Sequence, residues 1–305
     1  MRASHPERQP AALGLLGVPS SAGARRLGCE AGPAALRRAG VAASLGRGGR
    51  EVRDRGDLPP AVFRPDPANP RQRSLAAVGG VVSSVADAVG KAVDEGLTPI
   101  VLGGDCTISI GVLAALAPRR ERLGVIYLDG DLDLNTPETT PSGFFDGMNL
   151  AHIVGDGLER LARAGPAYPI VPEDRVAVFG FNEAGGGIDP YEFERLGRSG
   201  LHQFPADTVR RGPAQSAHRA LEALDSRVDH LFVHFDVDVV DELEMPAVDV
   251  RHPAGLTLDE VVAALRVFLE SPKWAGLVVT EFNGSLDRDG LFARNLVAAL
   301  SDAFG

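Results

Sequence analysis

The chain has 305 residues, of which 44% are hydrophobic and 24% are charged. Its 31 Lys and Arg against 41 Asp and Glu give a net charge of −10 at pH 7, which argues against a general binder of nucleic acid or of anionic membranes. The two cysteines, Cys29 and Cys106, exclude a disulfide scaffold and a four-cysteine zinc site. No apolar run reaches the roughly 18 residues of a membrane span, and the N-terminus carries no apolar stretch of signal-peptide length, so we expect a cytoplasmic protein.

Strand-like and helix-like segments alternate along the chain. We expect a disordered tail over residues 1–10, then one domain over residues 11–305. Apolar runs predict strands at 12–21, 98–104, 124–131, 174–181, 229–238 and 275–283. Helical patterns begin at Pro33 and occur at 78–93, 108–116, 213–225, 257–270 and 290–302, whereas the charged, proline-rich residues 50–75 predict a surface loop. This alternation is typical of an α/β fold, with a mostly parallel sheet covered on both faces.

Acidic motifs stand where the predicted strands end, and ligand sites of parallel sheets form at such ends. Asp129, Asp131 and Asp133 follow the apolar run GVIYL. Two carboxylates about 4 Å apart repel by roughly 4 kcal/mol at an effective dielectric near 20, and hard divalent cations prefer carboxylate oxygen. A cation is therefore expected here, although an isolated D-x-D-x-D motif is equally consistent with a solvated acidic turn.

Three further strand ends carry chemistry-bearing residues. His234, Asp236 and Asp238 end the run DHLFV, and two aspartates delivered by an apolar strand favour a metal site over a solvated turn. Cys106 follows two glycines after TPIVL; a thiolate can ligate a metal, but a small buried cysteine is the simpler interpretation. Glu281 follows GLVV and either anchors a cationic substrate group or caps a surface loop.

These four motifs, in this order, resemble the ureohydrolase family of arginases, agmatinases and formimidoylglutamases. That family reads G-G-D-H, D-A-H-x-D-x-N, S-x-D-x-D and E-x-N-P where this chain has GGDC (103–106), DGDLDLN (129–135), HFDVD (234–238) and EFNG (281–284). Segments 17–40, 135–143 and 254–261 are similar too. The resemblance implies a single-domain, three-layer αβα arginase/deacetylase-like fold, a homo-trimer or hexamer, and two Mn²⁺ per subunit. It also implies that a metal-bridging hydroxide hydrolyses a linear amidine or guanidine, which releases urea.

The resemblance also assigns roles to residues that match the family motifs. Four aspartates match metal ligands: Asp129, Asp133, Asp236 and Asp238. Glu281 matches the carboxylate that binds the substrate guanidinium. Asn135, Thr140 and Ser142 match positions that hold the α-carboxylate of an amino-acid substrate, and Asp189 matches the residue that binds its α-amino group.

The chain departs from the family at the histidines. Cys106 and Asp131 stand at the two ligand-histidine positions, Asp146 stands at that of the proton-shuttling histidine, and Val250 replaces a threonine that helps to pair the guanidinium. We expect Cys106 to complete one metal site and Asp131 the other, with Asp131, Asp146 and Glu281 as the catalytic residues and Asp146 as the group that protonates the leaving amine.

This altered ligand set changes the charge of the centre. Five aspartates and a thiolate carry −6 against the +4 of two divalent cations. Three outcomes follow: a group keeps its proton because like charges raise its pKa, the site holds a hard cation such as Mn²⁺ or Mg²⁺, or it holds one ion or none. In the last case the protein would be a catalytically inactive binding or scaffold member of the family.

A subgroup resemblance favours retained function. The cysteine at position 106, the segment N-T-P-E-T-T…G-M and His234 resemble bacterial hydroxyarginine hydrolases. His234 is interpreted either as an outer partner that orients an aspartate ligand or as a satisfied core histidine, and His152 and Cys29 as structural. A phosphoryl-transfer enzyme is disfavoured because no hydroxyl residue follows Asp129. The partner we expect is a small guanidino or amidino substrate, in a pocket that Phe144 and Phe145 make more apolar than that of an arginase.

Overall fold

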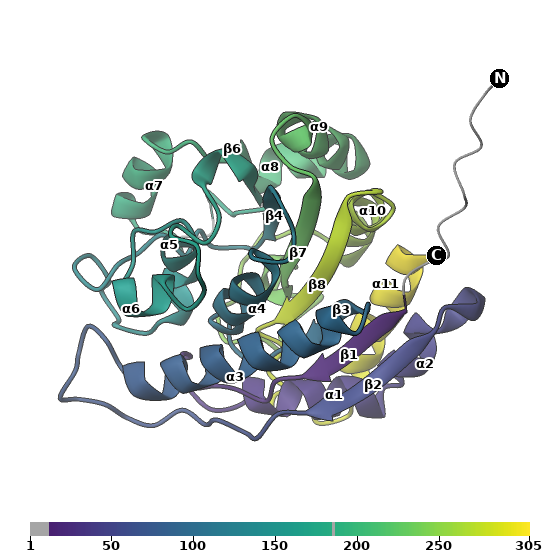
Figure 1. Ribbon diagram of the computed structural model, residues 1–305, viewed down its shortest axis with the longest axis horizontal. Coiled ribbons are helices and arrows are strands. Elements are labelled where there is room, and N and C mark those ends of the chain that lie inside the picture. Colours follow the sequence, from purple (N-terminus) through teal and green to yellow (C-terminus); the bar gives the residue numbers. More distant parts are fainter. Residues whose placement is uncertain (1–11, 185–186) are drawn as a thin grey trace.

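One eight-stranded sheet crosses the molecule in the computed structural model, which describes residues 12–184 and 187–305 (Figure 1). The paired strands are all parallel, in the order β2-β1-β3-β8-β7-β4-β5-β6. Their bounds are β1 Leu13–Gly17, β2 Val52–Asp57, β3 Thr98–Leu102, β4 Leu123–Leu128, β5 Val176–Phe179, β6 His202–Phe204, β7 His230–Asp236 and β8 Trp274–Thr280. The predicted single-domain α/β fold is confirmed.

Helices cover both faces of this sheet, so the molecule has three layers (Figure 1). One face is covered by α1 (Gly32–Arg38), α2 (Val41–Leu45), α8 (Ala206–Arg210), α9 (Pro213–Asp225), α10 (Leu258–Leu269) and α11 (Leu291–Phe304). The other is covered by α3 (Leu75–Asp94), α4 (Ile108–Leu116), α5 (Asn149–Ile153), α6 (Glu159–Ala162) and α7 (Pro190–Gly197).

Two hydrophobic cores result, because successive strand side chains point to opposite faces. In β4, Ile126 and Leu128 belong to one core and Val125 and Tyr127 to the other. This double burial explains why the central strands read as continuous apolar runs rather than as alternating ones.

Helix α3 is long and apolar enough, by length and composition, to cross a membrane. Its stripe of valines, however, lies in the second core against α4. A core helix passes the same length and composition test, and we interpret α3 as one.

The sequence predictions were wrong at both edges of the sheet. Residues 50–75 contain strand β2, which pairs with β1. Its sequence VRDRGD is half-buried only at its first residue and exposed elsewhere, so it carries no apolar signal, and charge on an edge strand limits unwanted pairing. At the other edge, the three-residue β6 was not predicted. The predicted tail at 1–10 lies outside the described residues.

The functional motifs follow four strands that are neighbours at the centre of the sheet. β3 leads to Cys106, β8 to Glu281, β7 to Asp236 and β4 to Asp129, and the order β3-β8-β7-β4 places these strands side by side. Because parallel strands end at the same edge, segments that are far apart in sequence meet there. The β3 end packs closely: a Cβ on Gly104 would lie 1.8 Å from the carbonyl oxygen of Ser20, so only glycine fits.

Candidate active site

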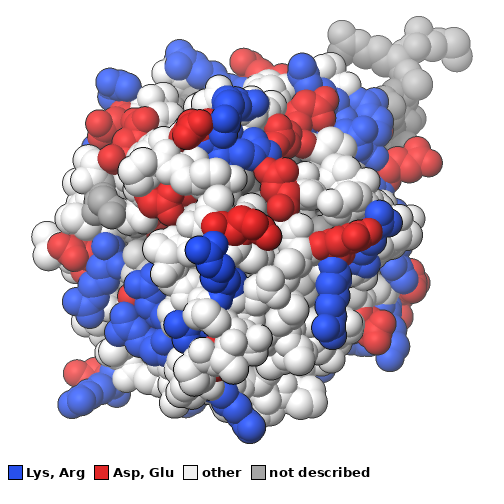
Figure 2. Space-filling model, turned by 90° about the vertical axis from the view of Figure 1, so that its left-hand side faces the viewer, with Lys and Arg blue, Asp and Glu red and all other residues white. Residues whose placement is uncertain are grey.

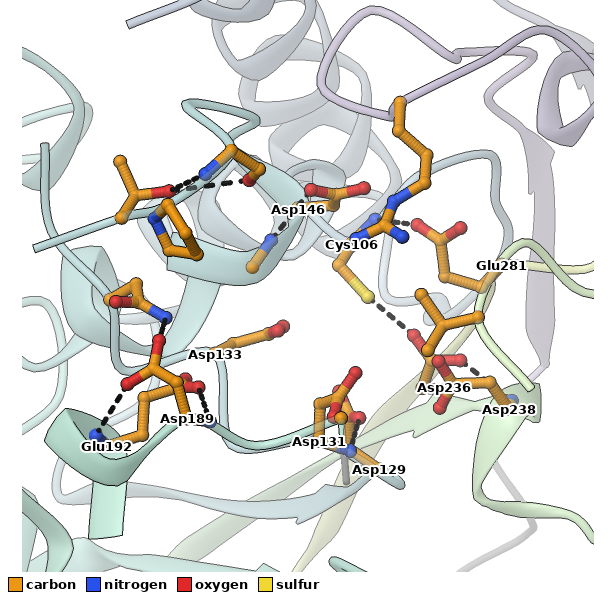
Figure 3. Close-up of a pocket in the computed structure, with 18 residues that line it drawn as sticks. Cys106, Asp129, Asp131, Asp133, Asp146, Asp189, Glu192, Asp236, Asp238 and Glu281 are labelled. Atoms are coloured by element: carbon orange, nitrogen blue, oxygen red, sulfur yellow. Dashed lines mark hydrogen bonds between the residues drawn. The ribbon is translucent and has the colours of Figure 1, made fainter. Parts of the chain in front are cut away.

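A cavity of about 130 Å³ lies at the carboxyl ends of these strands. All twelve residues that the sequence assigned to metal, substrate or catalysis line it: Cys106, Asp129, Asp131, Asp133, Asn135, Thr140, Ser142, Asp146, Asp189, Asp236, Asp238 and Glu281. Figure 3 shows the labelled carboxylates ringing an open centre, with Cys106 directed at Asp236 and with Asp189 and Glu192 on the opposite side. The structure thus gathers these residues, and their roles stay predictions.

Most of the aspartates lie outside the strands, contrary to the alternation argument made from the sequence; Asp236 is the exception, since it is the last residue of β7, and it shares a ligand group with His234 as that argument predicts. β4 ends at Leu128 and the following segment is irregular, while Asp238 lies in a 3₁₀ turn after β7. Asp133 and Glu281 have φ values of 52° and 61°, a left-handed conformation that is uncommon outside glycine and clusters at functional sites. Irregular backbone, rather than strand pleating, therefore aims the carboxylates that follow β4 and β8, and Asp238, into the cavity.

One group of possible metal ligands consists of Cys106, Asp129, His234 and Asp236, whose ligand atoms lie within 4.8 Å of one another. The Cys106 thiol donates to Asp236 Oδ2 at 2.7 Å. His234 Nε2 lies 3.6 Å from Cys106 Sγ and 3.7 Å from Asp129 Oδ2. Its Nδ1 lies 2.7 Å from Ser109 Oγ and its ring stacks on that of Tyr127, which fixes the imidazole beneath the cluster.

A second group consists of Asp131, Asp238 and His252. Asp238 Oδ1 accepts a hydrogen bond from the Gly130 N–H, at 3.2 Å. His252 Nε2 lies 3.5 Å from Asp131 Oδ2 and 3.9 Å from Asp238 Oδ2. This histidine stands outside the motifs that the sequence singled out.

Asp133 belongs to neither group, although it lines the same cavity. Its Oδ2 accepts a hydrogen bond from the Tyr127 hydroxyl at 2.5 Å, and that hydroxyl accepts one from Asn149 Nδ2 at 2.8 Å. One carboxylate oxygen is held by the core, and the other is left for a ligand.

The protonation of this centre reflects its burial and its crowding. Burial, followed by neighbouring carboxylates, raises the pKa of Asp129 and Asp236 well above the usual range, and burial does the same for Asp133 although Tyr127 opposes it. Burial raises the pKa of Asp238 to about 6. Burial and then Asp236 raise the pKa of the Cys106 thiol well above its ordinary value. Without cations, burial and crowding therefore favour the protonated forms of these groups more than water does.

The donor set fits divalent cations. Among residues 12–184 and 187–305, no Lys or Arg forms an ion pair with the five aspartates of the two motifs. Asp129 Oδ2 and Asp131 Oδ1 are buried and have no hydrogen-bond partner, which is costly unless something else satisfies them. Clustered carboxylate oxygens with unfilled acceptor capacity are what hard divalent cations require.

The opposite wall of the cavity holds the predicted substrate residues. Asn135 Nδ2 donates to Asp189 Oδ2 at 2.9 Å. Asp189 also begins α7, since its Oδ1 accepts from the backbone of Tyr191 and Glu192 in a capping box. Thr140 Oγ1 accepts from the backbone N–H groups of Ser142 and Gly143, which shapes the loop above them.

Glu281 lies between the two cysteines. Its Oε1 accepts from the Cys106 N–H at 2.9 Å and its Oε2 from the Cys29 thiol at 3.2 Å, so Cys29 supports the site rather than only the core. Burial and then Asp236 raise the pKa of Glu281 well above normal. Burial raises the pKa of Asp146 to about 7, which suits a carboxyl group that exchanges protons near neutrality. Val250 lines the cavity.

Sequence reasoning missed Glu192 and His252. Glu192 Oε1 accepts from the Leu134 N–H at 2.9 Å and so fixes the segment after Asp133; burial raises its pKa to about 8. The capping-box pattern D-P-Y-E at 189–192 could have located it. His252 lies in a loop with no motif, and nothing in the sequence pairs it with Asp131. His152 is a buried core residue, as expected, with Nδ1 2.6 Å from the Met148 carbonyl oxygen.

Comparison with known proteins agrees with this geometry. The model of the arginase family matches residues 11–304. The chain belongs to the arginase family. It is 33% identical to an arginase of Bacillus caldovelox over 296 residues, which are 96% of this chain and 98% of that one. It is 32% identical to an arginase of Brevibacillus brevis over 96% and 97% of the two chains.

Among solved structures, the arginase of Bacillus cereus matches with a TM-score of 0.88 and 32% identity over 97% of this chain and 98% of that one. This similarity confirms the arginase-like fold that the motifs predicted and supports a hydrolase of the arginase family.

Proposed function

We propose that this arginase-family protein hydrolyses a C–N bond of a linear guanidine or amidine and releases urea, with Mn²⁺ as the cation. The observation that carries the proposal is the ring of carboxylates with buried, unpartnered oxygens, faced by the carboxylate of Glu281. A cavity of about 130 Å³, lined mostly by carboxylates with Arg25 as its one cationic side chain among the described residues, suits a small cationic substrate. Similarity to arginases supports the reaction class.

Residues from both groups are positioned to hold two ions. Asp129 and Asp236, both of the first group, would contribute to both ion sites. Cys106 and Asp133 would complete one site, and Asp131 and Asp238 the other. When bound, divalent ions supply a hydroxide nucleophile at neutral pH and polarise the carbon under attack.

The remaining residues act on the substrate. Glu281 is held by the Cys106 N–H and the Cys29 thiol, and a fixed carboxylate pairs with a planar guanidinium through two parallel hydrogen bonds. Asp146, with a pKa of about 7, gives a proton to the leaving amine. Asn135, Thr140, Ser142 and Asp189, on the opposite wall, contact the other end of the substrate.

The setting we propose is a cytoplasmic homo-trimer or hexamer that acts on a small molecule. On the face in Figure 2, the acidic and basic side chains of the described residues are intermixed, so that face carries no broad positive field of the kind that nucleic-acid binding uses.

Urea release tests the proposal. Protein purified with Mn²⁺ is analysed for metal and screened with arginine, hydroxyarginine, agmatine, other guanidino compounds and formiminoglutamate. We expect urea from at least one guanidine, and a loss of at least about 100-fold in kcat/KM for Glu281→Gln, which removes a charged partner worth about 3 kcal/mol or more. Its Mn²⁺ content should be unchanged. Stoichiometric Mn²⁺ without turnover of any compound would favour the inactive scaffold instead.

A further inference from the structure

His252 is the most unusual polar side chain near the cavity. It is 1% exposed, yet both of its ring nitrogens lack a hydrogen-bond partner among the described residues. Its backbone is fixed, because its carbonyl oxygen accepts hydrogen bonds from the N–H groups of Glu242 and Gly255. A buried imidazole held in place without hydrogen bonds needs a partner that the described residues do not supply by hydrogen bonding.

The distances around Nε2 match a coordination shell better than hydrogen bonds. The atom lies 3.5 Å from Asp131 Oδ2 and 3.9 Å from Asp238 Oδ2, beyond the range of about 2.7–3.2 Å for such hydrogen bonds. Two ligands that are each about 2.1 Å from one ion, at angles of 90° to 180°, lie about 3.0–4.2 Å apart. Both distances fall within that range.

Gly130 shows that the site is built around this ring. A Cβ on residue 130 would lie 2.4 Å from His252 Cδ2 and 2.7 Å from Nε2. The family motif D-A-H has an alanine where this chain has Gly130 and a histidine where it has Asp131. This chain thus lacks both the family's imidazole at position 131 and its methyl group at position 130. The imidazole of His252, from the loop after β7, lies against Gly130 where that methyl group would be.

We propose that His252 supplies a nitrogen ligand to the divalent cation that Asp131 and Asp238 hold, in place of the family histidine missing at position 131. The inference rests on the proposed function in so far as that function requires a cation here. The competing interpretation is that His252 is a counter-ion that neutralises the two aspartates and excludes a metal. The two interpretations predict opposite effects of removing the ring.

The test compares Mn²⁺ binding by the full chain and by His252→Ala. Electron paramagnetic resonance of the free ion gives the Kd, and pulsed electron paramagnetic resonance of the bound ion gives the ¹⁴N modulation. We expect the Kd of at least one bound Mn²⁺ to rise by about 100-fold, at the upper end of the effect of disturbing groups around a metal site, and the ¹⁴N modulation of bound Mn²⁺ to decrease. His218→Ala, which removes an exposed histidine, is the matched control and should change neither. Unchanged or tighter Mn²⁺ binding in His252→Ala would overturn the inference, and so would a wild-type chain that binds no Mn²⁺.

A second variant guards against a folding defect. Gly130→Ala keeps the imidazole but places a methyl group against it, so it should also weaken Mn²⁺ binding, whereas adding it to His252→Ala should cause little further loss. Thermal melting of each variant in EDTA reports folding without the metal. Urea release is measured separately. If Mn²⁺ binding depends on His252 but no compound is turned over, only the proposed function is contradicted. If urea is released but Mn²⁺ binding does not depend on His252, only this inference is contradicted.

Discussion

The protonation of the ion-free centre predicts a steep pH dependence of metal binding. Each carboxylate that must lose a proton before it ligates weakens the binding tenfold for every pH unit below its pKa. The pKa of Asp238, about 6, alone gives a tenfold weaker affinity at pH 5 than at high pH, or about 1.4 kcal/mol. Burial and neighbouring carboxylates also raise the pKa values of Asp129, Asp133 and Asp236, so these groups add to the dependence in the same direction.

The sign of the stability effect follows from the same groups. Asp238 has a folded pKa near 6 against a usual value of 3.8, so in EDTA its contribution to stability is complete below about pH 4 and is lost as the pH rises through 6. Buried His152 and His234, whose pKa values are lowered to about 4 and about 3, act in the opposite direction. The difference between Mn²⁺ and EDTA cancels the contribution of His152, which lies outside the centre, and reports the centre together with His234, which lies beside Cys106 and Asp129.

The assay is Mn²⁺ affinity between pH 6 and 8, together with thermal melting in EDTA and in Mn²⁺. We expect Kd to fall clearly as the pH rises from 6 to 8, because raised carboxylate pKa values make protons compete with the cation, and we expect Mn²⁺ at 100 times Kd to stabilise the fold by about 2.7 kcal/mol. Asp94→Asn, which removes an exposed acid bound to Arg119, should leave the slope unchanged. A Kd that stays within threefold over this range would refute the argument that crowded, protonated carboxylates form the site.

Two further substitutions test separate parts of the cavity. Cys106→His restores the family motif, and we expect tighter Mn²⁺ binding in a direct titration. A neutral imidazole avoids the cost of deprotonating a thiol whose pKa burial has raised. Weaker binding would show that the thiolate is the better ligand here. Asp189→Ala removes the capping box of α7 and should lower the free energy of unfolding, measured by urea denaturation, by about 1 kcal/mol. It should also raise the KM for substrates that carry an α-amino group. An unchanged KM would place Asp189 outside the substrate site.

The central strands were predictable because their burial is visible in the local sequence of each strand. Strands buried on both faces must be apolar along their whole length, so β3, β4, β7 and β8 are visible as continuous runs. The edge strands β2 and β6 gain their conformation from pairing with a neighbour, and a charged segment such as VRDRGD carries no sign of that partner. The pairing order, too, is a property of the whole chain.

The site was predictable as a set of motifs and unpredictable in its contacts. Strand ends located Asp129, Asp236 and Glu281. Strand alternation holds for His234 and Asp236, which lie in β7, but not for Asp129, Asp131 and Asp133, which an irregular segment after β4 positions. His252 reaches Asp131 across more than a hundred residues of sequence, and only the folded chain reveals that pairing.

The loss of two family histidines does not by itself imply a dead centre. In the ion-free protein, burial and Asp236 raise the pKa of Cys106 far enough that the thiol keeps its proton at pH 7, and the thiol donates that proton to Asp236. In this ion-free state five carboxylates line the centre, against four in the family set. The additional carboxylate is that of Asp131, whose Oδ2 lies 3.5 Å from His252 Nε2. As a neutral nitrogen ligand, His252 would not offset the charge of this carboxylate, but it places an imidazole next to the position where the family histidine is missing.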